Sequence, residues 1–431
     1  MAGPNVLPAP WTAADAERWL LSLEAFGMRF GLDRMRSLMT ALGAPNAAFR
    51  AIHVVGTNGK SSTVRMIAAI LGRHGVRTGA YLSPHLVSFA ERIRVDGADV
   101  TPQQFAAAAA RAHAATQLVD GALEAGDRVT QFEALTAAAY RRLADARVEV
   151  AVVEAGLGGR CDATNVIDAE IAVLTNVDLE HTRWLGSTVE QIACEKLAVL
   201  ASGATLVLGA DLHPAVDAQA VLAAERRGAT IVRAPAAPDD LAPGLRLLAR
   251  GDFQRRNFAV ACTAAQAYLG SLDRARVRAA AASTSVPGRF DVVADPGGHG
   301  ELVLDGAHNP AGVAALTASL PRFLAGRSLV AVVSVLDDKD AAPMLASLLE
   351  LCAGVVFTAS ANPRALPAAT LAALAGDLPA GVRARVEDDP RRALARAREL
   401  AGDDGVVLAT GSIYLVADLM RPAGAGRGST L

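Results

Sequence analysis

Residues 52–62 read Ile52-His53-Val54-Val55-Gly56-Thr57-Asn58-Gly59-Lys60-Ser61-Ser62, an apolar run that leads into a glycine-containing loop and then a helix. This order directs backbone N–H groups and a helix N-terminus at one point, which suits the phosphates of a nucleotide. We expect Lys60 to reach the terminal phosphates, and Ser61 or Ser62 to bind a phosphate or its magnesium. The match to the common phosphate-loop pattern is imperfect, because its first glycine falls at Val54. A ligand-free strand-to-helix turn is therefore the alternative.

Strands and helices alternate on both sides of this stretch, as in a parallel α/β sheet. The expected strands of this first series lie near residues 51–55, 78–82, 148–154, 170–175, 204–208 and 229–233. Its expected helices are 61–73, 102–116, 131–145, 188–200 and 255–269. The alternation breaks at Val286-Pro287-Gly288-Arg289 and again around Pro296-Gly297-Gly298.

A second series of elements follows the break. Its expected strands lie near residues 301–305, 329–335, 354–358 and 405–410, and its helices near 310–323, 340–351, 367–375 and 390–401. We therefore predict two α/β domains. Residues 1–285 form an ATPase-like phosphate-loop domain with a mainly parallel sheet, and residues 286–431 form a smaller, Rossmann-like α/β domain.

Composition narrows the class of protein. The chain has 431 residues, of which 52% are hydrophobic and 20% charged, so it can bury a sizeable core. Its net charge of -2 gives no basic face for nucleic acid. We expect no membrane span and no signal peptide, since no apolar run is long enough and no Lys or Arg precedes Arg18. The spacing of the cysteines is not that of a metal or redox site, which favours a reducing cytoplasm. The chain has four of them, at Cys161, Cys194, Cys262 and Cys352.

Lysine is scarce in a chain whose other basic residues are all arginine. It occurs only at Lys60, Lys196 and Lys339. A compact or deprotonatable amine can do what a guanidinium cannot, so these positions are functional candidates, although chance is the alternative. Lys196 adjoins the apolar residues 197–200, where a partnered or modified amine is a possible reading.

Polar residues follow several of the expected strands. Glu154 ends one strand and is a natural magnesium ligand, and His181 follows the next strand at the same edge of the sheet. A surface Glu in a tight turn and a structural His are the alternatives. In the second domain, residues 305–309 (Asp-Gly-Ala-His-Asn) follow a strand, and so do residues 337–340, although a solvated charge run is the usual explanation for the latter.

An ATP–magnesium site in one domain that faces a polar rim on the other suits an enzyme that activates a carboxylate with ATP. The resulting acyl phosphate is a good leaving group, and an amine can then form an amide in a site that excludes water. A phosphate-loop kinase or a nucleotide-gated binding protein are alternatives of another class. A kinase does not need the second domain with Asp305 and His308, and a degenerate binding protein is expected to have lost Lys60, Glu154 or His181.

The ordered motifs resemble the Mur ligase superfamily, and within it the folate branch of dihydrofolate synthase and folylpolyglutamate synthase. The resemblance covers nearly the whole chain. It is carried by residues 56–60, Ser83-Pro84-His85-Leu86, Phe132-Glu133, residues 154–160 with Asp162-Ala163-Thr164-Asn165, His181-Thr182, Glu195-Lys196, residues 287–290, residues 305–310, Lys339-Asp340 and Thr410-Gly411-Ser412.

The resemblance implies that L-glutamate is joined to dihydropteroate and to folates through an acyl phosphate, at the expense of ATP and with two magnesium ions. It implies catalytic roles for Lys60, Lys196 and His308. Residues that match ATP contacts are Thr57, Asn58, Gly59, Lys60, Ser61, Ser62, Asn257, Arg289 and Asp305. Ser83, Glu154 and His181 match ligands of one magnesium ion, and Lys196 resembles the lysine that this family carbamylates as a ligand of the second.

The remaining positions match the two other substrates. His308 and Lys339 match residues near the incoming glutamate. The pterin-side pocket matches Thr130, Gln131, Phe132, Cys161, Asp162 and Ala163. Monomers are usual in this family.

The chain departs from the folate pattern at four positions. Ser61 stands where Gly is usual, Glu180 replaces Asp, Phe253 replaces His, and Gln131 replaces an aromatic residue. Two further readings within the superfamily therefore stay open. One is a folylpolyglutamate synthase without the dihydropteroate step, and the other is a muramyl-type amino-acid ligase with another carboxylate acceptor. Against the latter, the 55 residues before Gly56 are too short for the nucleotide-sugar domain of those enzymes.

Overall fold

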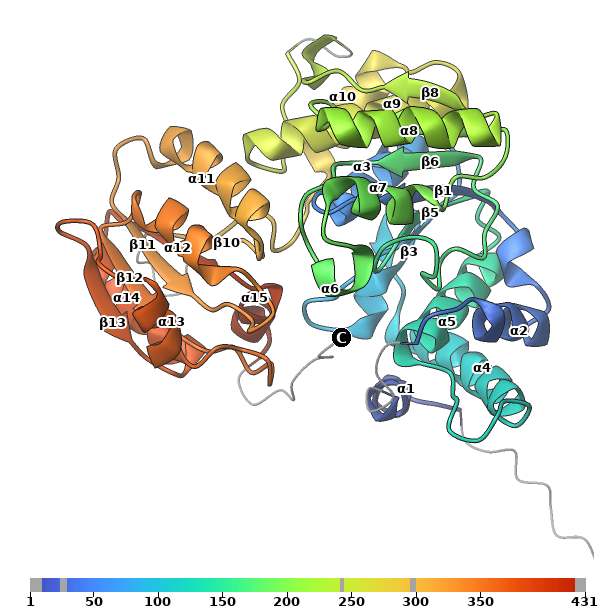
Figure 1. Ribbon diagram of the computed structural model, residues 1–431, viewed down its shortest axis with the longest axis horizontal. Helices are drawn as coiled ribbons and strands as arrows, with labels where there is room; N and C mark the ends of the chain where they lie inside the picture. The colour runs from blue at the N-terminus through green and yellow to red at the C-terminus, as the bar shows by residue number, and fades with distance from the viewer. Residues whose placement is uncertain (1–9, 24–28, 241–243, 295–299, 423–431) are drawn as a thin grey trace, which may run out of the picture.

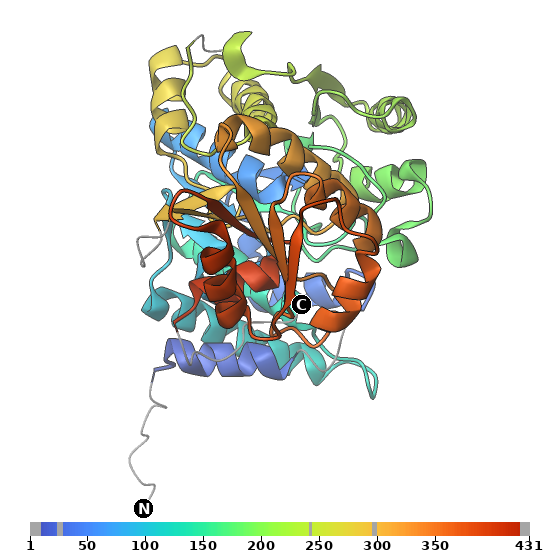
Figure 2. The ribbon, with the colours of Figure 1, turned by 90° about the vertical axis from the view of Figure 1, so that its left-hand side faces the viewer.

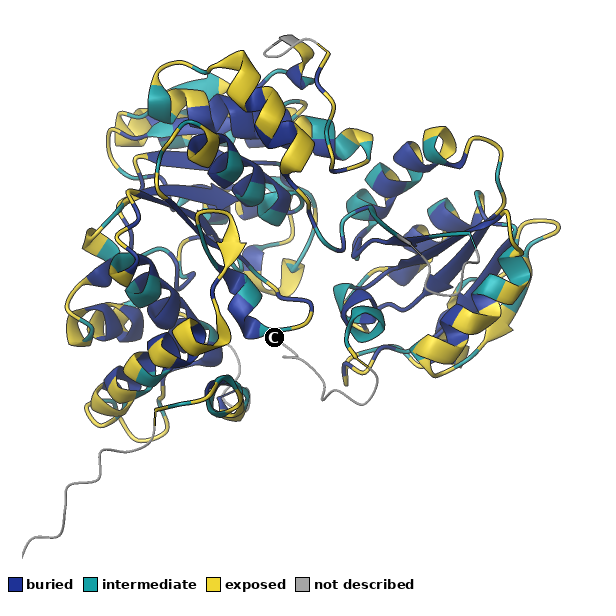
Figure 3. Cartoon of the chain, turned by 180° about the vertical axis from the view of Figure 1, so that it is seen from behind, coloured by how far each residue is buried: buried dark blue, intermediate teal, exposed yellow. Residues whose placement is uncertain are grey.

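The protein folds into two α/β units, each built on its own sheet (Figure 1). The structure is a computed structural model, and it describes residues 10–23, 29–240, 244–294 and 300–422. Buried strands form the middle of each unit, and the exposed residues lie on the outer sides of the helices (Figure 3). Among the described residues, no helix has the length and apolar character needed to cross a bilayer.

The first unit contains an eight-stranded sheet in the order β4-β3-β2-β5-β1-β6-β7-β8. Six strands run parallel, as the sequence predicted: β1 (Arg50–Val55), β2 (Thr78–Tyr81), β5 (Val150–Glu154), β6 (Ile171–Leu174), β7 (Thr205–Leu208) and β8 (Thr230–Arg233). The sequence reading missed the antiparallel pair β3 (Ile93–Val95) and β4 (Ala98–Asp99). These strands are too short to show a period-2 pattern.

Strand β1 occupies the centre of this sheet because both of its faces are apolar. Ile52 and Val54 face α3 (Lys60–Arg73) and α9 (Asp252–Leu269). Helix α10 (Arg274–Ser283) packs against α3. Ala51, on the opposite face, packs in the core formed with the helices α1 (Ala13–Ser22), α2 (Asp33–Ala41), α4 (Pro102–Asp120) and α5 (Gln131–Asp145). The β6–β7 side of that face is covered by α7 (Val189–Leu197) and α8 (Pro214–Arg227). Helices therefore cover both faces, and ligands can approach only from the strand ends.

The second unit contains a six-stranded sheet in the order β13-β12-β11-β14-β10-β9. Its parallel strands are β10 (Glu301–Leu304), β11 (Leu329–Val333), β12 (Gly354–Phe357), β13 (Arg383–Val386) and β14 (Val406–Thr410). Helices α11 (Pro310–Leu324), α12 (Ala341–Leu349) and α13 (Ala368–Leu374) pack on one face, and α14 (Pro390–Ala401) and α15 (Ile413–Met420) on the other. The predicted Rossmann-like class is confirmed.

The two units are joined by residues 284–290, which run from α10 to β9 (Asp291–Ala294), a strand antiparallel to β10. The predicted boundary at residue 286 falls in this connection, and the second predicted break at 296–298 lies outside the described residues. Ser319 Oγ of α11 accepts a hydrogen bond from Asp252 N at the start of α9, at 3.1 Å. Figure 2 views the molecule with the second unit in front of the first. Helix α9 of the first unit therefore contacts α11 of the second.

Candidate active site

The loop between β1 and α3 has the geometry that residues 52–62 predicted. Gly56 and Gly59 have φ values of 153° and 82°, which favour glycine. A Cβ at Gly56 would lie 1.8 Å from Thr175 Oγ1, and one at Gly59 would lie 2.4 Å from Asn257 Oδ1. Lys60 Nζ donates to the carbonyl oxygens of Gly56 and Thr57, each at 3.0 Å. The loop is therefore compact, and the first turn of α3 begins directly behind it.

Neighbouring strands and helices hold this loop in place. Asn58 N donates to Asn176 Oδ1 at 2.8 Å, and Thr175 Oγ1 donates to the carbonyl oxygen of Asn58 at 2.7 Å. Asn257 of α9 lies beside Gly59 and donates to Gln254 Oε1 at 3.0 Å. The sequence reading did not select Thr175 and Asn176 as site residues. Their position at the carboxyl end of β6, next to the phosphate loop, was the signal that could have found them.

Glu154 ends β5 beside this loop and is 1% exposed. Its Oε1 accepts a hydrogen bond from Ser61 Oγ at 2.9 Å, and its Oε2 accepts one from Ser83 N at 3.0 Å. Burial raises the pKa of Glu154, and the positive charge of Lys60 opposes that rise in part. The predicted ligands Ser83 and Glu154 therefore lie together, next to the phosphate-loop helix.

His181 is placed at the same edge by the segment that follows β6. It adopts a left-handed backbone conformation (φ 50°) as the N-cap of α6 (Thr182–Leu185). Burial, followed by the charge of Lys339, lowers the pKa of His181 to about 4, so its imidazole is neutral at pH 7. A neutral imidazole can serve as a metal ligand.

A carboxylate, a hydroxyl and a neutral imidazole form a donor set that fits magnesium when phosphate oxygens and water complete the coordination. The described part of the chain contains no group of three or more His, Cys, Asp or Glu side chains placed to hold a metal ion. A magnesium ion at Glu154 and His181 would therefore need further ligands, such as the Ser83 hydroxyl and oxygens of a nucleotide.

Lys196 lies on α7 and is 5% exposed. Its Nζ donates to the carbonyl oxygen of Gly56 at 2.9 Å, so this amine reaches the phosphate loop from another helix. Burial, and secondarily the charge of Lys60, lowers the pKa of Lys196 to about 7. Near neutral pH the amine is therefore uncharged in a substantial fraction of molecules.

The second unit contributes Asp305, which directly follows β10 and is 3% exposed. Its two carboxylate oxygens accept hydrogen bonds from Phe290 N and Ala307 N, each at 2.7 Å. Burial raises the pKa of Asp305, and the charge of Arg289 opposes that rise. The carboxylate thus shapes the turn that carries His308 and Asn309.

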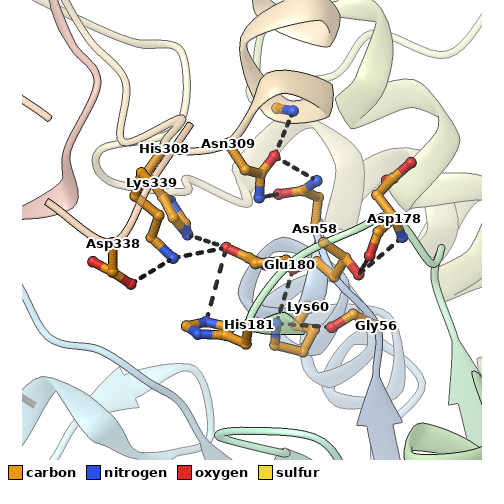
Figure 4. A network of polar contacts seen from close by, with 12 residues as sticks. Gly56, Asn58, Lys60, Asp178, Glu180, His181, His308, Asn309, Asp338 and Lys339 are labelled. Carbon is orange, nitrogen blue, oxygen red and sulfur yellow. Dashed lines mark hydrogen bonds and ion pairs between the residues drawn. The ribbon is translucent and has the colours of Figure 1, made fainter. Parts of the chain in front are cut away.

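Four further polar contacts cross from the first unit to the second, three of them to this turn and one to Lys339 (Figure 4). Asn58 and Asn309 exchange amide hydrogen bonds, Asn58 Nδ2 to Asn309 Oδ1 at 3.2 Å and Asn309 Nδ2 to Asn58 Oδ1 at 3.1 Å. Glu180 Oε1 lies 3.1 Å from His308 Nε2 and 3.3 Å from Lys339 Nζ. Burial opposes ionisation of Glu180, but the His308 hydrogen bond and the nearby positive charges hold its pKa well below the usual range.

The candidate pterin-side residues lie around the start of α5 and the loop after β5. Phe132 and Asp162 both lie close to Gly156, where a Cβ would be 2.5 Å from Phe132 Cζ and 3.1 Å from Asp162 Oδ2. Asp162 accepts hydrogen bonds from Leu157 N at 2.7 Å and from Thr164 N at 3.0 Å. Cys161 is partly exposed and Ala163 is buried in the same loop.

Polar side-chain atoms of Thr130 and Gln131 form hydrogen bonds within the fold. Thr130 forms a capping box with Glu133 at the start of α5, and Gln131 Nε2 donates to the carbonyl oxygen of Leu20 at 2.9 Å. The sequence reading missed Arg34, whose Nε lies 3.1 Å from Glu133 Oε1 in a buried ion pair. Gln131 and Arg34 thus attach α1 and α2 to this side of the site.

Comparison with known proteins supports the same architecture. Residues 54–223 match the Mur ligase middle domain, and residues 288–413 match the Mur ligase glutamate ligase domain. The chain is 35% identical over 406 residues to a dihydrofolate synthase/folylpolyglutamate synthase of Mycobacterium tuberculosis, covering 86% of this chain and 83% of that one. It is 30% identical over 430 residues to the Bacillus subtilis protein of the same name, covering 94% and 98%.

Solved structures are similar over most of the chain. Folylpolyglutamate synthase of M. tuberculosis complexed with ADP superposes with a TM-score of 0.85 at 32% identity, covering 94% of this chain and 98% of that one. Escherichia coli FolC in complex with DHPP and ADP superposes with a TM-score of 0.83 at 29% identity, covering 95% and 97%. The resemblance therefore includes both units and the connection between them.

Proposed function

The chain belongs to the Mur ligase family, in the branch of dihydrofolate synthase and folylpolyglutamate synthase, and we propose how its residues perform that branch's reaction. It is an ATP-dependent ligase that joins L-glutamate to a pteroate or folate carboxylate. A carboxylate oxygen attacks the γ-phosphorus of ATP and ADP leaves. The glutamate amine then attacks the acyl phosphate, phosphate leaves, and an amide is formed.

The phosphate loop binds and orients ATP. We assign the phosphates to the loop residues 57–59, to Lys60, and to Ser61 and Ser62 on the first turn of α3, where backbone N–H groups and the helix dipole favour anions. Lys60 Nζ donates to two loop carbonyls, which hold the amine beside the proposed phosphate position. Asn257, Arg289 and Asp305 supply the remaining contacts to ATP.

Ser83, Glu154 and His181 would hold one magnesium ion, which, when bound, neutralises charge that develops on the transferred phosphoryl group. Lys196 in its carbamylated form would contribute a carboxylate to a second ion. The environment of Lys196 supports this assignment, because a buried amine with a pKa of about 7 supplies the neutral form that reacts with carbon dioxide.

His308 and Lys339 bind the incoming glutamate on the second unit. Thr130, Gln131, Phe132, Cys161, Asp162 and Ala163 form the pterin-side pocket, in which Phe132 offers the aromatic ring. The domains correspond to residues 1–285 and 286–431. We propose a monomer without nucleic-acid or membrane partners. We also propose that it is cytoplasmic, because the cysteine spacing favours a reducing compartment.

One observation carries these assignments. Lys60, Glu154 and Lys196 converge on the phosphate loop of the first unit, and His308 and Lys339 face that unit from the second. Transfer of an activated acyl group to an amine requires such opposed sites, with the reacting atoms held together and apart from water.

The test is ATP-dependent phosphate release by the purified protein with magnesium and L-glutamate. Three acceptors are compared: 7,8-dihydropteroate, tetrahydrofolate and a muramyl nucleotide. We expect release with both pterins. Release with tetrahydrofolate alone would identify a folylpolyglutamate synthase without the first step. Release with only the muramyl nucleotide would contradict the folate assignment.

A further inference from the structure

A single carboxylate oxygen lies where two donors of the second unit meet. Glu180 Oε1 is 3.1 Å from His308 Nε2 and 3.3 Å from Lys339 Nζ (Figure 4). The side chains of Glu180 and Lys339 are each 8% exposed, and that of His308 is 28% exposed. The contact is therefore largely shielded from water, and it joins the first unit to the second.

The two donors are oriented by their own unit. His308 Nδ1 lies 2.8 Å from the carbonyl oxygen of Gly306, which leaves Nε2 directed at Glu180. Nδ1 therefore faces a backbone acceptor, and Nε2 faces a carboxylate oxygen, to which it can donate a hydrogen bond. Lys339 lies in the loop after β11, and its main-chain N–H donates to the carbonyl oxygen of Leu336 at 3.1 Å. The second unit thus presents a two-donor site for a carboxylate.

The charges around Lys339 are already balanced. Besides Glu180, Asp338 Oδ2 lies 3.5 Å from Lys339 Nζ. A carboxylate that arrives from solution finds no uncompensated cation there unless one of these two acids moves away. Exchange of one carboxylate for another preserves the pairing of the buried ammonium group, whereas loss of both partners would be costly.

Resting on the proposed function, we propose that Glu180 determines the affinity for the amino-acid substrate by occupying the place of its carboxylate, which the incoming L-glutamate takes over. Glu180 and the substrate present the same chemical group to His308 and Lys339. The side chain of Glu180 is long enough to bring one carboxylate oxygen within reach of both donors. A side chain that competes for the site lowers the apparent affinity for the substrate. The reduction is in proportion to the fraction of protein molecules in which the site is free.

The experiment measures the KM for L-glutamate in Glu180→Asp and Glu180→Gln, with the acceptor and MgATP saturating. We expect the KM to fall about five- to tenfold in both variants, as for a site freed from an internal competitor. The KM for ATP and the magnesium dependence should stay as in the wild type, which separates this effect from damage at the neighbouring His181. Glu301→Gln is the matched control, because Glu301 pairs with Arg327 at 2.6 Å, in a contact between two residues of the second unit.

The outcomes distinguish this inference from the proposed function. An unchanged or higher KM for glutamate in both variants, with wild-type ATP kinetics, would overturn the inference alone. Wild-type protein that hydrolyses ATP with no dependence on glutamate would overturn both. Glu180→Asp keeps the charge and Glu180→Gln keeps the shape, so a folding defect in one variant, detected by its melting temperature, leaves the other to decide.

Discussion

The carboxyl-terminal edges of the two sheets resemble each other in position but differ in how they are completed. In the first unit, Lys60, Glu154 and Lys196 make their hydrogen bonds to residues of the same unit. In the second, His308 and Lys339 contact Glu180 across the domain boundary. The contacts of Lys60, Glu154 and Lys196 are thus formed within one unit, whereas the edge proposed to bind the amino acid depends on how the two units are placed.

Removal of the Lys196 amine should have the largest effect on turnover, because this amine contacts the phosphate loop within the first unit. We expect Lys196→Ala to lose turnover by about 1,000-fold, equivalent to about 4 kcal/mol of barrier, with ATP binding largely retained. Single-turnover kinetics and nucleotide titration measure the two quantities. Lys60→Ala is the matched comparison, since it should weaken ATP binding as well. Near-normal turnover of Lys196→Ala would remove Lys196 from the mechanism.

Substitution of Asp305 tests whether hydrogen bonds within the second unit hold the turn after β10 in place. Asp305→Ala leaves the buried N–H groups of Phe290 and Ala307 without their acceptor, so we expect a loss of about 2–4 kcal/mol in the free energy of unfolding. Urea denaturation measures it. Asp305→Asn retains one acceptor oxygen and should cost less. Equal stability of Asp305→Ala and the wild type would show that the turn keeps its shape without this carboxylate.

Acid should destabilise the first unit through a buried histidine. His53, on β1, is fully buried, and burial lowers its pKa to about 3 from the usual 6.5. Between these values only the unfolded chain binds the proton, so stability falls as the pH drops below about 6.5, by about 1.4 kcal/mol per unit. The free energies of unfolding from urea denaturation at pH 7 and pH 5 should therefore differ by about 2 kcal/mol less in His53→Gln than in the wild type.

An identical pH dependence in His53→Gln and the wild type would contradict the assignment of a neutral, buried His53.

The smallest expected effect concerns the amide pair between the units. Asn309 caps α11 through Gly312 N at 2.7 Å and also donates to Asn58. Asn309→Ala should lower stability by about 1 kcal/mol and raise the KM for ATP about fivefold. Asn309→Asp keeps the cap but removes the donor, so it should restore stability and leave the KM raised. If both variants bind ATP as the wild type does, the pair has no part in nucleotide binding.

Much of the fold could be predicted from the sequence, because buried parallel strands are short apolar runs with strong local signals. The six parallel strands of the first sheet and the helices α3, α4, α5, α7 and α9 were expected within a few residues, whereas the helices α1, α2, α8 and α10 were not. The elements missed have weak patterns, such as β13, whose residues Arg383–Val386 are mostly exposed. Helix α1 carries a capping box of Thr12 and Asp15, a signal that could have identified it.

The pterin-side residues show where motif matching reaches its limit. Thr130 and Asp162 match substrate positions of the family, yet both use their oxygens to cap a helix or to shape a loop. A motif gives the residue type at a position but not the direction of the side chain. The direction follows from neighbours far apart in the sequence, such as Leu20 for Gln131.

By itself, the sequence determined the α/β class, the phosphate loop and the family, because each rests on local patterns or on ordered motifs along the chain. Only the tertiary structure decided that Lys196 reaches Gly56 from another helix and that Glu180 occupies the donors of His308 and Lys339. These contacts join residues between 120 and 160 positions apart, and their burial shifts the ionisation of Lys196 and Glu180. Burial and long-range pairing arise only when the sheets assemble, so no local pattern could reveal them.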